Sequence, residues 1–257
     1  MNSPTFPAAF SLRDQLVVIT GGGTGIGLAV AQGMHAAGAR VVLVGRRVAE
    51  LTASANSLGP GASHIVHDIT ELEGAGPLIQ RIMREHGPID CLVNNAGIHL
   101  KKAAVDTTDA EFQAVLATHI FGAHALTREV VPTMIERKHG SILFMASMAS
   151  LFGIPLVVAY SAAKSAMVGM VRTLATELSP HGVRVNAIAP GWIDTDMSRK
   201  ALDSDPARKA KILSRTPMAR LGDPADIGWA AVYLASPAAR FITGVTLPID
   251  GGVSMGF

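Results

Sequence analysis

Short apolar runs recur along the chain, and stretches with helical periodicity lie between them. Such runs are typical of strands in a parallel sheet, because a sheet covered on both faces needs apolar side chains on both sides. They predict strands at 16–20, 40–44, 63–67, 89–94, 140–145, 183–189 and 243–249. Alternating strands and helices pair in parallel through right-handed crossovers. We therefore expect an α/β fold, with one doubly wound sheet of about seven parallel strands and helices on both faces.

Composition indicates that one domain is enough. A chain of 257 residues with 49% hydrophobic and 16% charged residues can bury a large core. We expect residues 1–257 to form a single domain. The single cysteine, Cys91, has no partner for an internal disulfide and is interpreted as a core residue of its strand rather than a nucleophile.

Charge and hydropathy exclude some partners. The formal net charge is +2 and no dense Lys/Arg cluster occurs, so nucleic acid is not expected as a partner. No apolar run approaches the ~18 residues of a membrane span, and residues 1–10 lack the pattern of a secretory signal. We expect a cytoplasmic protein with a small-molecule substrate and with neither a membrane nor a metal site.

A glycine-rich turn directly follows the first predicted strand. It extends from Thr20 to Gly27 and carries glycines at 21, 22, 23, 25 and 27. Glycine lets the backbone turn sharply and approach a ligand, and the free amides of the following helix favour a pyrophosphate. Such a turn alone is weak evidence. The strand before it, the helix after it and the next strand at 40–44 favour a dinucleotide site over a plain loop.

Tyr160 and Lys164 occur one helical turn apart in a stretch that favours helix, so their side chains are predicted to share one face. An ammonium at ~4 Å in a medium of effective dielectric ~20 favours a phenolate by roughly 4 kcal/mol, or about three pKa units. Tyr160 is then predicted to exchange a proton near neutrality. A chance spacing on a helix surface would explain the pair if it stood alone, but Ser147 follows the predicted strand 140–145 just upstream.

Together these motifs resemble the short-chain dehydrogenase/reductase family, from about residue 12 to the end of the chain. They are Thr-Gly-x-x-x-Gly-x-Gly at 20–27, Asn-Asn-Ala-Gly at 94–97, Ser147, Tyr160 with Lys164, and Pro190-Gly191 followed by Thr195. The resemblance implies a Rossmann-like fold, with residues 1–257 as a single dinucleotide-binding oxidoreductase domain and a substrate lid around 193–216. It also implies that Tyr160 is the general acid/base, that Lys164 lowers its pKa and holds the nicotinamide ribose, and that Ser147 polarises the substrate carbonyl.

The end of the second strand bears on the choice of cofactor. An acidic residue there would bind a ribose 2′-hydroxyl, whereas this chain has Arg46 and Arg47, which suit a 2′-phosphate. This favours NADP, with NAD possible; the alternative is a solvated pair of charges. The resemblance implies that Asp68 contacts adenine. The full set of predicted cofactor contacts is Gly21, Thr24, Gly25, Ile26, Gly27, Arg46, Arg47, Asp68, Ile69, Asn95, Ala96, Gly97, Tyr160, Lys164, Pro190, Gly191, Ile193 and Thr195.

His119 departs from the family pattern, which has a catalytic asparagine at this position. A neutral imidazole has one donor and one acceptor, so it could replace the asparagine in a proton relay. The alternative is a core histidine with no part in catalysis. If the relay is broken, the chain could be a slow enzyme or a cofactor-binding protein.

Substrate chemistry is indicated by two basic segments. One is 98–102, which ends in Lys101 and Lys102, and the other carries Arg199, Lys200, Arg208, Lys209, Lys211 and Arg215. Both could face the mouth of the site and attract an anion, and the first resembles a run in gluconate 5-dehydrogenases. A solvated lid face is the alternative.

We predict NADP(H)-dependent hydride transfer on a keto-sugar acid such as 5-ketogluconate. The alternatives are a 3-oxoacyl thioester reductase and, in another class, an NADPH-binding regulator with little catalysis. The resemblance also implies a homotetramer.

Overall fold

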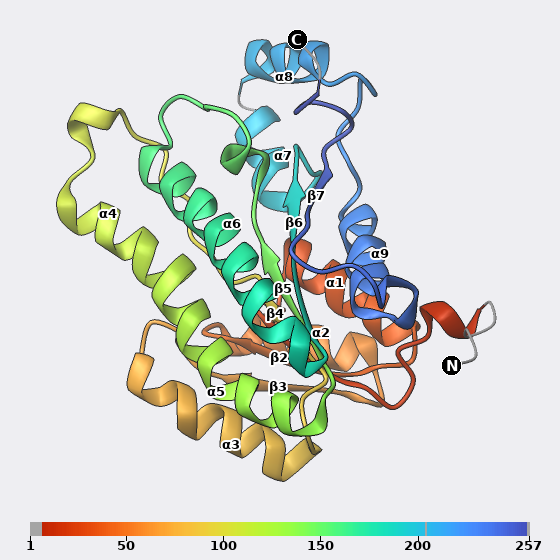
Figure 1. Ribbon diagram of the computed structural model, residues 1–257. Coiled ribbons are helices and arrows are strands. Elements are labelled where there is room, and N and C mark those ends of the chain that lie inside the picture. The colour runs from red at the N-terminus through yellow and green to blue at the C-terminus, as the bar shows by residue number, and fades with distance from the viewer. Residues whose placement is uncertain (1–6, 204, 256–257) are drawn as a thin grey trace.

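A single parallel sheet of seven strands forms the centre of the computed structural model, which describes residues 7–203 and 205–255 (Figure 1). The strands are β1 Leu16–Thr20, β2 Arg40–Gly45, β3 Ala62–Val66, β4 Cys91–Asn94, β5 Gly140–Met145, β6 Val183–Pro190 and β7 Thr246–Ile249. Their order in the sheet is β3-β2-β1-β4-β5-β6-β7. All seven predicted strands are confirmed, and the chain reverses its direction of travel across the sheet between β1 and β4, which makes this the switch point.

Helices cover both faces of the sheet (Figure 1). The α-helices are α1 Gly25–Ala36, α2 Val48–Leu58, α3 Ala75–His86, α4 Asp109–Leu116, α5 Ala123–Arg137, α6 Val158–Leu178, α7 Asp196–Asp203, α8 Pro206–Arg215 and α9 Pro224–Ala235. A π-helical stretch, Ala117–Gly122, joins α4 to α5, and short 3-10 turns lie at Ala8–Phe10, Leu72–Gly74, Ala104–Asp106, Met148–Ser150, Ser179–His181 and Pro237–Ala239. The expected Rossmann-like, doubly wound fold is confirmed.

The core consists of two apolar layers, one on each face of the sheet. Side chains of α1, α2 and α9 pack on one face, and those of α3, α5 and α6 pack on the other. Cys91 is fully buried in the first layer, and burial raises the pKa of its thiol to about 12. This agrees with a core residue and with an inert thiol.

Some predicted boundaries were wrong by a few residues, and the backbone explains the largest difference. The last strand was expected from 243 but begins at Thr246, because Gly244 adopts a φ of 78° that an extended strand does not allow. The third strand lies one residue earlier than predicted, and the fourth begins at Cys91.

Local sequence signals place the helices. A capping box begins α4, where Thr108 accepts a hydrogen bond from the Glu111 backbone and Glu111 accepts one from Thr108. Asp223 and Asp226 form the same arrangement before α9, with Pro224 in its first turn. Helices α7 and α8 lie beyond the carboxyl ends of the strands, at the top of Figure 1, where the lid was predicted. No described helix is long and apolar enough to cross a membrane.

Candidate active site

The glycine-rich turn is braced from the neighbouring strand β4. The Thr20 hydroxyl accepts hydrogen bonds from the backbone amides of Asn95 and Ala96, both at 3.0 Å. The Asn95 side chain donates to the carbonyl oxygens of Thr20 and Gly21 at 2.9 and 3.2 Å. Gly21 has a φ of 66°, which glycine adopts without strain. These bonds hold the glycine-rich turn against the Asn-Asn-Ala-Gly segment, so the two motifs, which are distant in the sequence, form one structural unit.

Space at the turn is too small for larger residues. A Cβ at Gly27 would lie 2.2 Å from the Gly21 carbonyl oxygen, so helix α1 can start this close to the turn only with glycine there. Thr195 lies on the opposite side, 3.8 Å from the position of a Cβ on Gly25. The start of α1 therefore faces Thr195 across the edge of the sheet, which is where a pyrophosphate would meet free amides.

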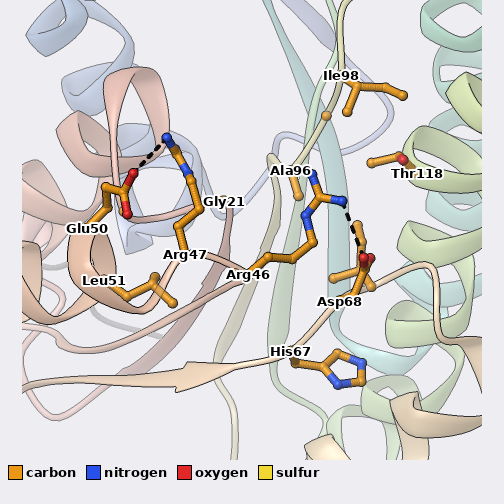
Figure 2. A pocket seen from close by; sticks show the side chains of 14 residues that line it. Gly21, Arg46, Arg47, Glu50, Leu51, His67, Asp68, Ala96, Ile98 and Thr118 are labelled. Atoms are coloured by element: carbon orange, nitrogen blue, oxygen red, sulfur yellow. Dashed lines mark hydrogen bonds and ion pairs between the residues drawn. The ribbon is translucent and has the colours of Figure 1, made fainter.

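A pocket lies beside this turn, at the carboxyl ends of β1, β2, β3 and β4 (Figure 2). Of the predicted cofactor residues, Gly21, Arg46, Arg47, Asp68, Ile69, Ala96 and Gly97 line it. The pocket also includes Gly23 of the glycine-rich turn, and residues that the sequence did not assign to the cofactor: Gly45, Glu50, Leu51, His67, Ile98 and Thr118. His67 directly precedes Asp68 at a strand end, so its position along the chain was an available signal.

The two arginines of this pocket point in different directions (Figure 2). Arg46 pairs with Asp68 at 3.3 Å, whereas Arg47 pairs with Glu50 at 3.1 Å and donates to the Thr24 hydroxyl at 2.9 Å. The pKa of Asp68 is lowered despite desolvation, by hydrogen bonds from Thr70 and from Arg46. Both guanidinium groups are more than half exposed, so both can reach a ligand at the rim.

The other predicted cofactor residues lie outside this pocket. Ile193 is 5% exposed and packs in the core, with its backbone paired to Gly222. Ile26 also packs partly against the core, at the start of α1. Gly191 approaches Asp250 so closely that a Cβ would lie 2.6 Å from the Asp250 Cα, and Pro190 ends β6.

Ser147, Tyr160 and Lys164 come together beyond the end of β5. Ser147 follows this strand and its hydroxyl accepts a hydrogen bond from the Ala149 amide at 3.1 Å. Tyr160 and Lys164 lie in the first part of α6, as predicted. Lys164 is 3% exposed, donates to the Met145 carbonyl oxygen, and has its ammonium 5.4 Å from the centre of the Tyr160 ring.

The predicted lowering of the Tyr160 pKa is wrong for this structure. Burial raises the pKa of Tyr160, and a hydrogen bond with Ser147 only partly opposes that rise. Burial also lowers the pKa of Lys164 to about 7, so its ammonium is not fully charged near neutrality. The prediction counted the attraction between two charges and left out the cost of desolvating each of them.

His119 lies in the π-helical stretch, 2% exposed, with its ring edge toward Tyr160 at a centroid distance of 5.5 Å. Its Nε2 lies 2.8 Å from the Ile98 carbonyl oxygen and 3.2 Å from the Ile98 backbone nitrogen, so it donates to the carbonyl or accepts from the amide according to which ring nitrogen carries the proton. Nδ1 is buried with no hydrogen-bond partner among the described residues. Burial, and next the charge of Lys164, lower the pKa of His119 to about 3, so the ring stays neutral.

A second histidine, which sequence reasoning missed, also contacts the tyrosine. The ring of His99 lies 5.0 Å from that of Tyr160, tilted by 52°. The signal for it was weak, because His99 lies in an irregular segment after Gly97 and only the fold places it near α6. In the part of the chain that the structure describes, no group of three or more His, Cys, Asp or Glu side chains is arranged to hold a metal ion.

Known proteins resemble this chain along nearly its whole length. The sequence model of a family described as enoyl-(acyl carrier protein) reductase matches residues 21–254. A 3-oxoacyl-(acyl-carrier-protein) reductase FabG from Vibrio harveyi is 34% identical, and the alignment covers 95% of this chain and 99% of that protein.

Two solved structures are also similar. One, from Beutenbergia cavernae, is described as a putative NAD(P)-dependent gluconate 5-dehydrogenase with bound NADP; it is 37% identical, with a TM-score of 0.91, over 96% of this chain and 100% of that one. The other is a gluconate 5-dehydrogenase from Burkholderia cenocepacia in complex with NADP and tartrate, 31% identical, with a TM-score of 0.93, over 97% of this chain and 99% of that one.

Proposed function

The chain belongs to the short-chain dehydrogenase/reductase family, whose members are oxidoreductases that act on CH–OH groups with NAD(P), and from this premise we propose that it reduces a keto-sugar acid with NADPH, reversibly. The observation that carries the proposal is the convergence of Ser147, Tyr160 and Lys164 beyond the end of β5, on the same edge of the sheet as the glycine-rich turn. Hydride passes between the nicotinamide and the carbonyl carbon when the cofactor is bound. The residues of this chain supply binding, orientation and the proton.

Tyr160 is proposed as the group that gives the proton to the carbonyl oxygen, and Ser147 as a hydrogen-bond donor to the same oxygen. The raised pKa of Tyr160 keeps the phenol protonated before reduction, which suits a general acid. The buried Lys164 is proposed to hold the nicotinamide ribose and to stabilise the phenolate left after proton transfer. In the oxidising direction the same phenolate would act as the base.

NADP is proposed as the preferred cofactor because Arg46 and Arg47 line the pocket at the end of β2. Two exposed guanidinium groups at this position offer charge-assisted hydrogen bonds to a 2′-phosphate. Both of the similar solved structures described above contain NADP. Asp68, held by Arg46, is proposed to face the adenosine side.

His119 is proposed to take the place of the family asparagine in the proton relay. Its Nε2 is held by the Ile98 backbone, so only the buried Nδ1 remains to hydrogen-bond a relay partner. A ring with a pKa near 3 does not take the proton itself. His119 therefore acts as a neutral ring that orients a relay partner near Tyr160 through Nδ1, and no titration of this ring is expected near neutral pH.

Keto-sugar acids are favoured over acyl thioesters by the gluconate 5-dehydrogenase names of similar structures and by the tartrate, a hydroxy acid, found in one of them. The family match and the FabG relative favour a 3-oxoacyl thioester reductase as the second candidate. Initial rates with NADPH on 5-ketogluconate and on an acetoacetyl thioester separate the two. Faster turnover of the keto acid is expected; turnover of the thioester alone would favour the second candidate.

A catalytically weak NADPH-binding regulator is the remaining candidate, and tight cofactor binding without turnover of any carbonyl would support it.

We also propose a homotetramer in the cytoplasm, as the family resemblance implies. Two apolar side chains, Phe121 in the π-helical stretch and Val158 at the start of α6, are 51% and 43% exposed and are suited to contact between copies. Light scattering coupled to size-exclusion chromatography tests this, and a monomer at micromolar concentration would refute it.

A further inference from the structure

The segment after Gly97 is held against the start of α6, next to Tyr160. Lys102 donates its amide to the Leu156 carbonyl oxygen at 2.7 Å and pairs with Val157 in an isolated parallel bridge. This attachment places the His99 ring over Tyr160, at a centroid distance of 5.0 Å. His99 is exposed, so its ring nitrogens can contact a ligand that lies against the phenol.

Three basic residues of the two segments are already engaged within the chain. Lys102 binds Glu111 at 2.9 Å, Arg199 binds Asp194 and Asp196 at 3.1 and 2.7 Å, and Lys209 binds Asp203 at 3.2 Å. Lys101, Lys211 and Arg215 are exposed. The first three residues carry their own counter-charges, and the last three fit a solvated surface.

Arg208 differs from both groups. It forms no ion pair with any described residue, unlike the first three, and it is only partly exposed, unlike the last three. Its guanidinium carbon lies 5.7 Å from the centre of the Trp192 ring, which is close enough for a cation–π contact. Trp192 follows Pro190-Gly191 at the end of β6, so the contact ties α8 of the lid to the edge of the sheet that carries the site.

Trp192 follows β6 and His99 follows β4, so Arg208, which packs on Trp192, and His99 lie at the same edge of the sheet although they come from distant parts of the chain. Burial is the main cause of a lowered pKa for His99, and the charges of Arg208 and then Lys101 lower it further. A guanidinium without an acidic partner among the described residues and an exposed imidazole thus lie at the edge that carries Tyr160. An anionic group bound by both would accept two or more hydrogen bonds.

We propose that Arg208, with His99, binds the carboxylate of the substrate and so selects keto acids over neutral ketoses. Trp192 is the positioning residue that holds the guanidinium in place. The inference rests on the proposed function, because it names the part of the site that recognises the acid group. It also distinguishes Arg208 from the other lid cations, which the sequence could not separate.

The test compares Arg208→Met with wild type, using NADPH and two ketones that differ in charge, 5-ketogluconate and fructose. Methionine keeps an apolar contact with Trp192 but has no charge. We expect the KM for 5-ketogluconate to rise roughly tenfold or more, with kcat within about twofold. The rate with fructose and the Kd for NADPH stay unchanged. Arg199→Met is the matched control on the same lid, because Arg199 is paired with two aspartates, and it leaves the KM near that of wild type.

The outcomes separate this inference from the proposed function. If wild type turns over 5-ketogluconate and Arg208→Met has the same KM, the inference is wrong and the proposed function stands. A parallel loss with fructose would also overturn it, since the effect would then be unrelated to the carboxylate. If wild type turns over no keto acid, the proposed function and this inference fall together. His99→Ala provides a second variant, for which the same selective rise in KM is expected.

Discussion

Replacing Arg46 with aspartate is expected to reverse the preference of the enzyme between NADPH and NADH. Arg46 lines the pocket at the end of β2, and its side chain is 63% exposed and paired with Asp68 at 3.3 Å. A hydrogen bond to a charged group contributes about 1.5–3 kcal/mol, so losing one to a 2′-phosphate weakens NADPH binding roughly 10- to 150-fold. Aspartate adds repulsion of the phosphate and can instead accept from a ribose hydroxyl.

The fold should tolerate this change, because an exposed ion pair contributes about 0–1 kcal/mol to stability. The assay is kcat/KM for each cofactor at a fixed substrate concentration, together with thermal unfolding to check integrity. Arg81→Ala is the control, because Arg81 forms a similar exposed pair with Glu85 on α3, away from the pocket. An unchanged NADPH to NADH ratio in Arg46→Asp would refute the assignment of Arg46 to the 2′-phosphate.

Three further predictions concern the groups around Tyr160. His119→Ala is expected to lower kcat about tenfold or more, while the Kd for NADPH stays within about twofold, because only the imidazole of the proton relay is lost. An unchanged kcat would identify His119 as a core histidine. Gly97→Ala places a Cβ 2.3 Å from the His119 ring and is expected to lower the free energy of unfolding in urea by about 1–3 kcal/mol. The same change in a His119→Ala background should lower it by less. An equal loss in both backgrounds would show that the ring is not the obstacle. Lys164 has a pKa lowered from 10.5 to about 7, so unfolded chains bind more protons than folded ones between these values and stability should rise with pH across that window. The unfolding free energy of wild type relative to Lys164→Met should therefore increase from pH 7.5 to 9.5, by at most about 1.4 kcal/mol per pH unit, and a flat difference would contradict the buried, partly neutral lysine.

The fold could be predicted from the sequence because its signals are local. Apolar runs such as 16–20 and 140–145 are buried along their full length, as strands of a covered parallel sheet must be. Boundaries were less accurate where a single backbone conformation decided them, as at Gly244. The glycine-rich turn could be found, but its bracing by Thr20 and Asn95 depends on contact between β1 and β4.

The candidate site was only partly predictable for the same reason. Tyr160 and Lys164 share a helix face, so their spacing alone brought them together. His99 and Arg208 lie in separate segments, and only the folded chain brings the first to Tyr160 and the second to Trp192. Burial was also invisible in the sequence, and this is why the predicted direction of the Tyr160 pKa shift was wrong.

The central claim is that Tyr160 supplies the proton in an NADPH-dependent carbonyl reduction. It is tested most directly by the rate of NADPH oxidation with 5-ketogluconate, measured for wild type and for Tyr160→Phe, with cofactor affinity determined for both. The account predicts turnover by wild type, a loss of at least about 100-fold in kcat for the variant and a nearly unchanged Kd for NADPH. Equal turnover by the two proteins would contradict it.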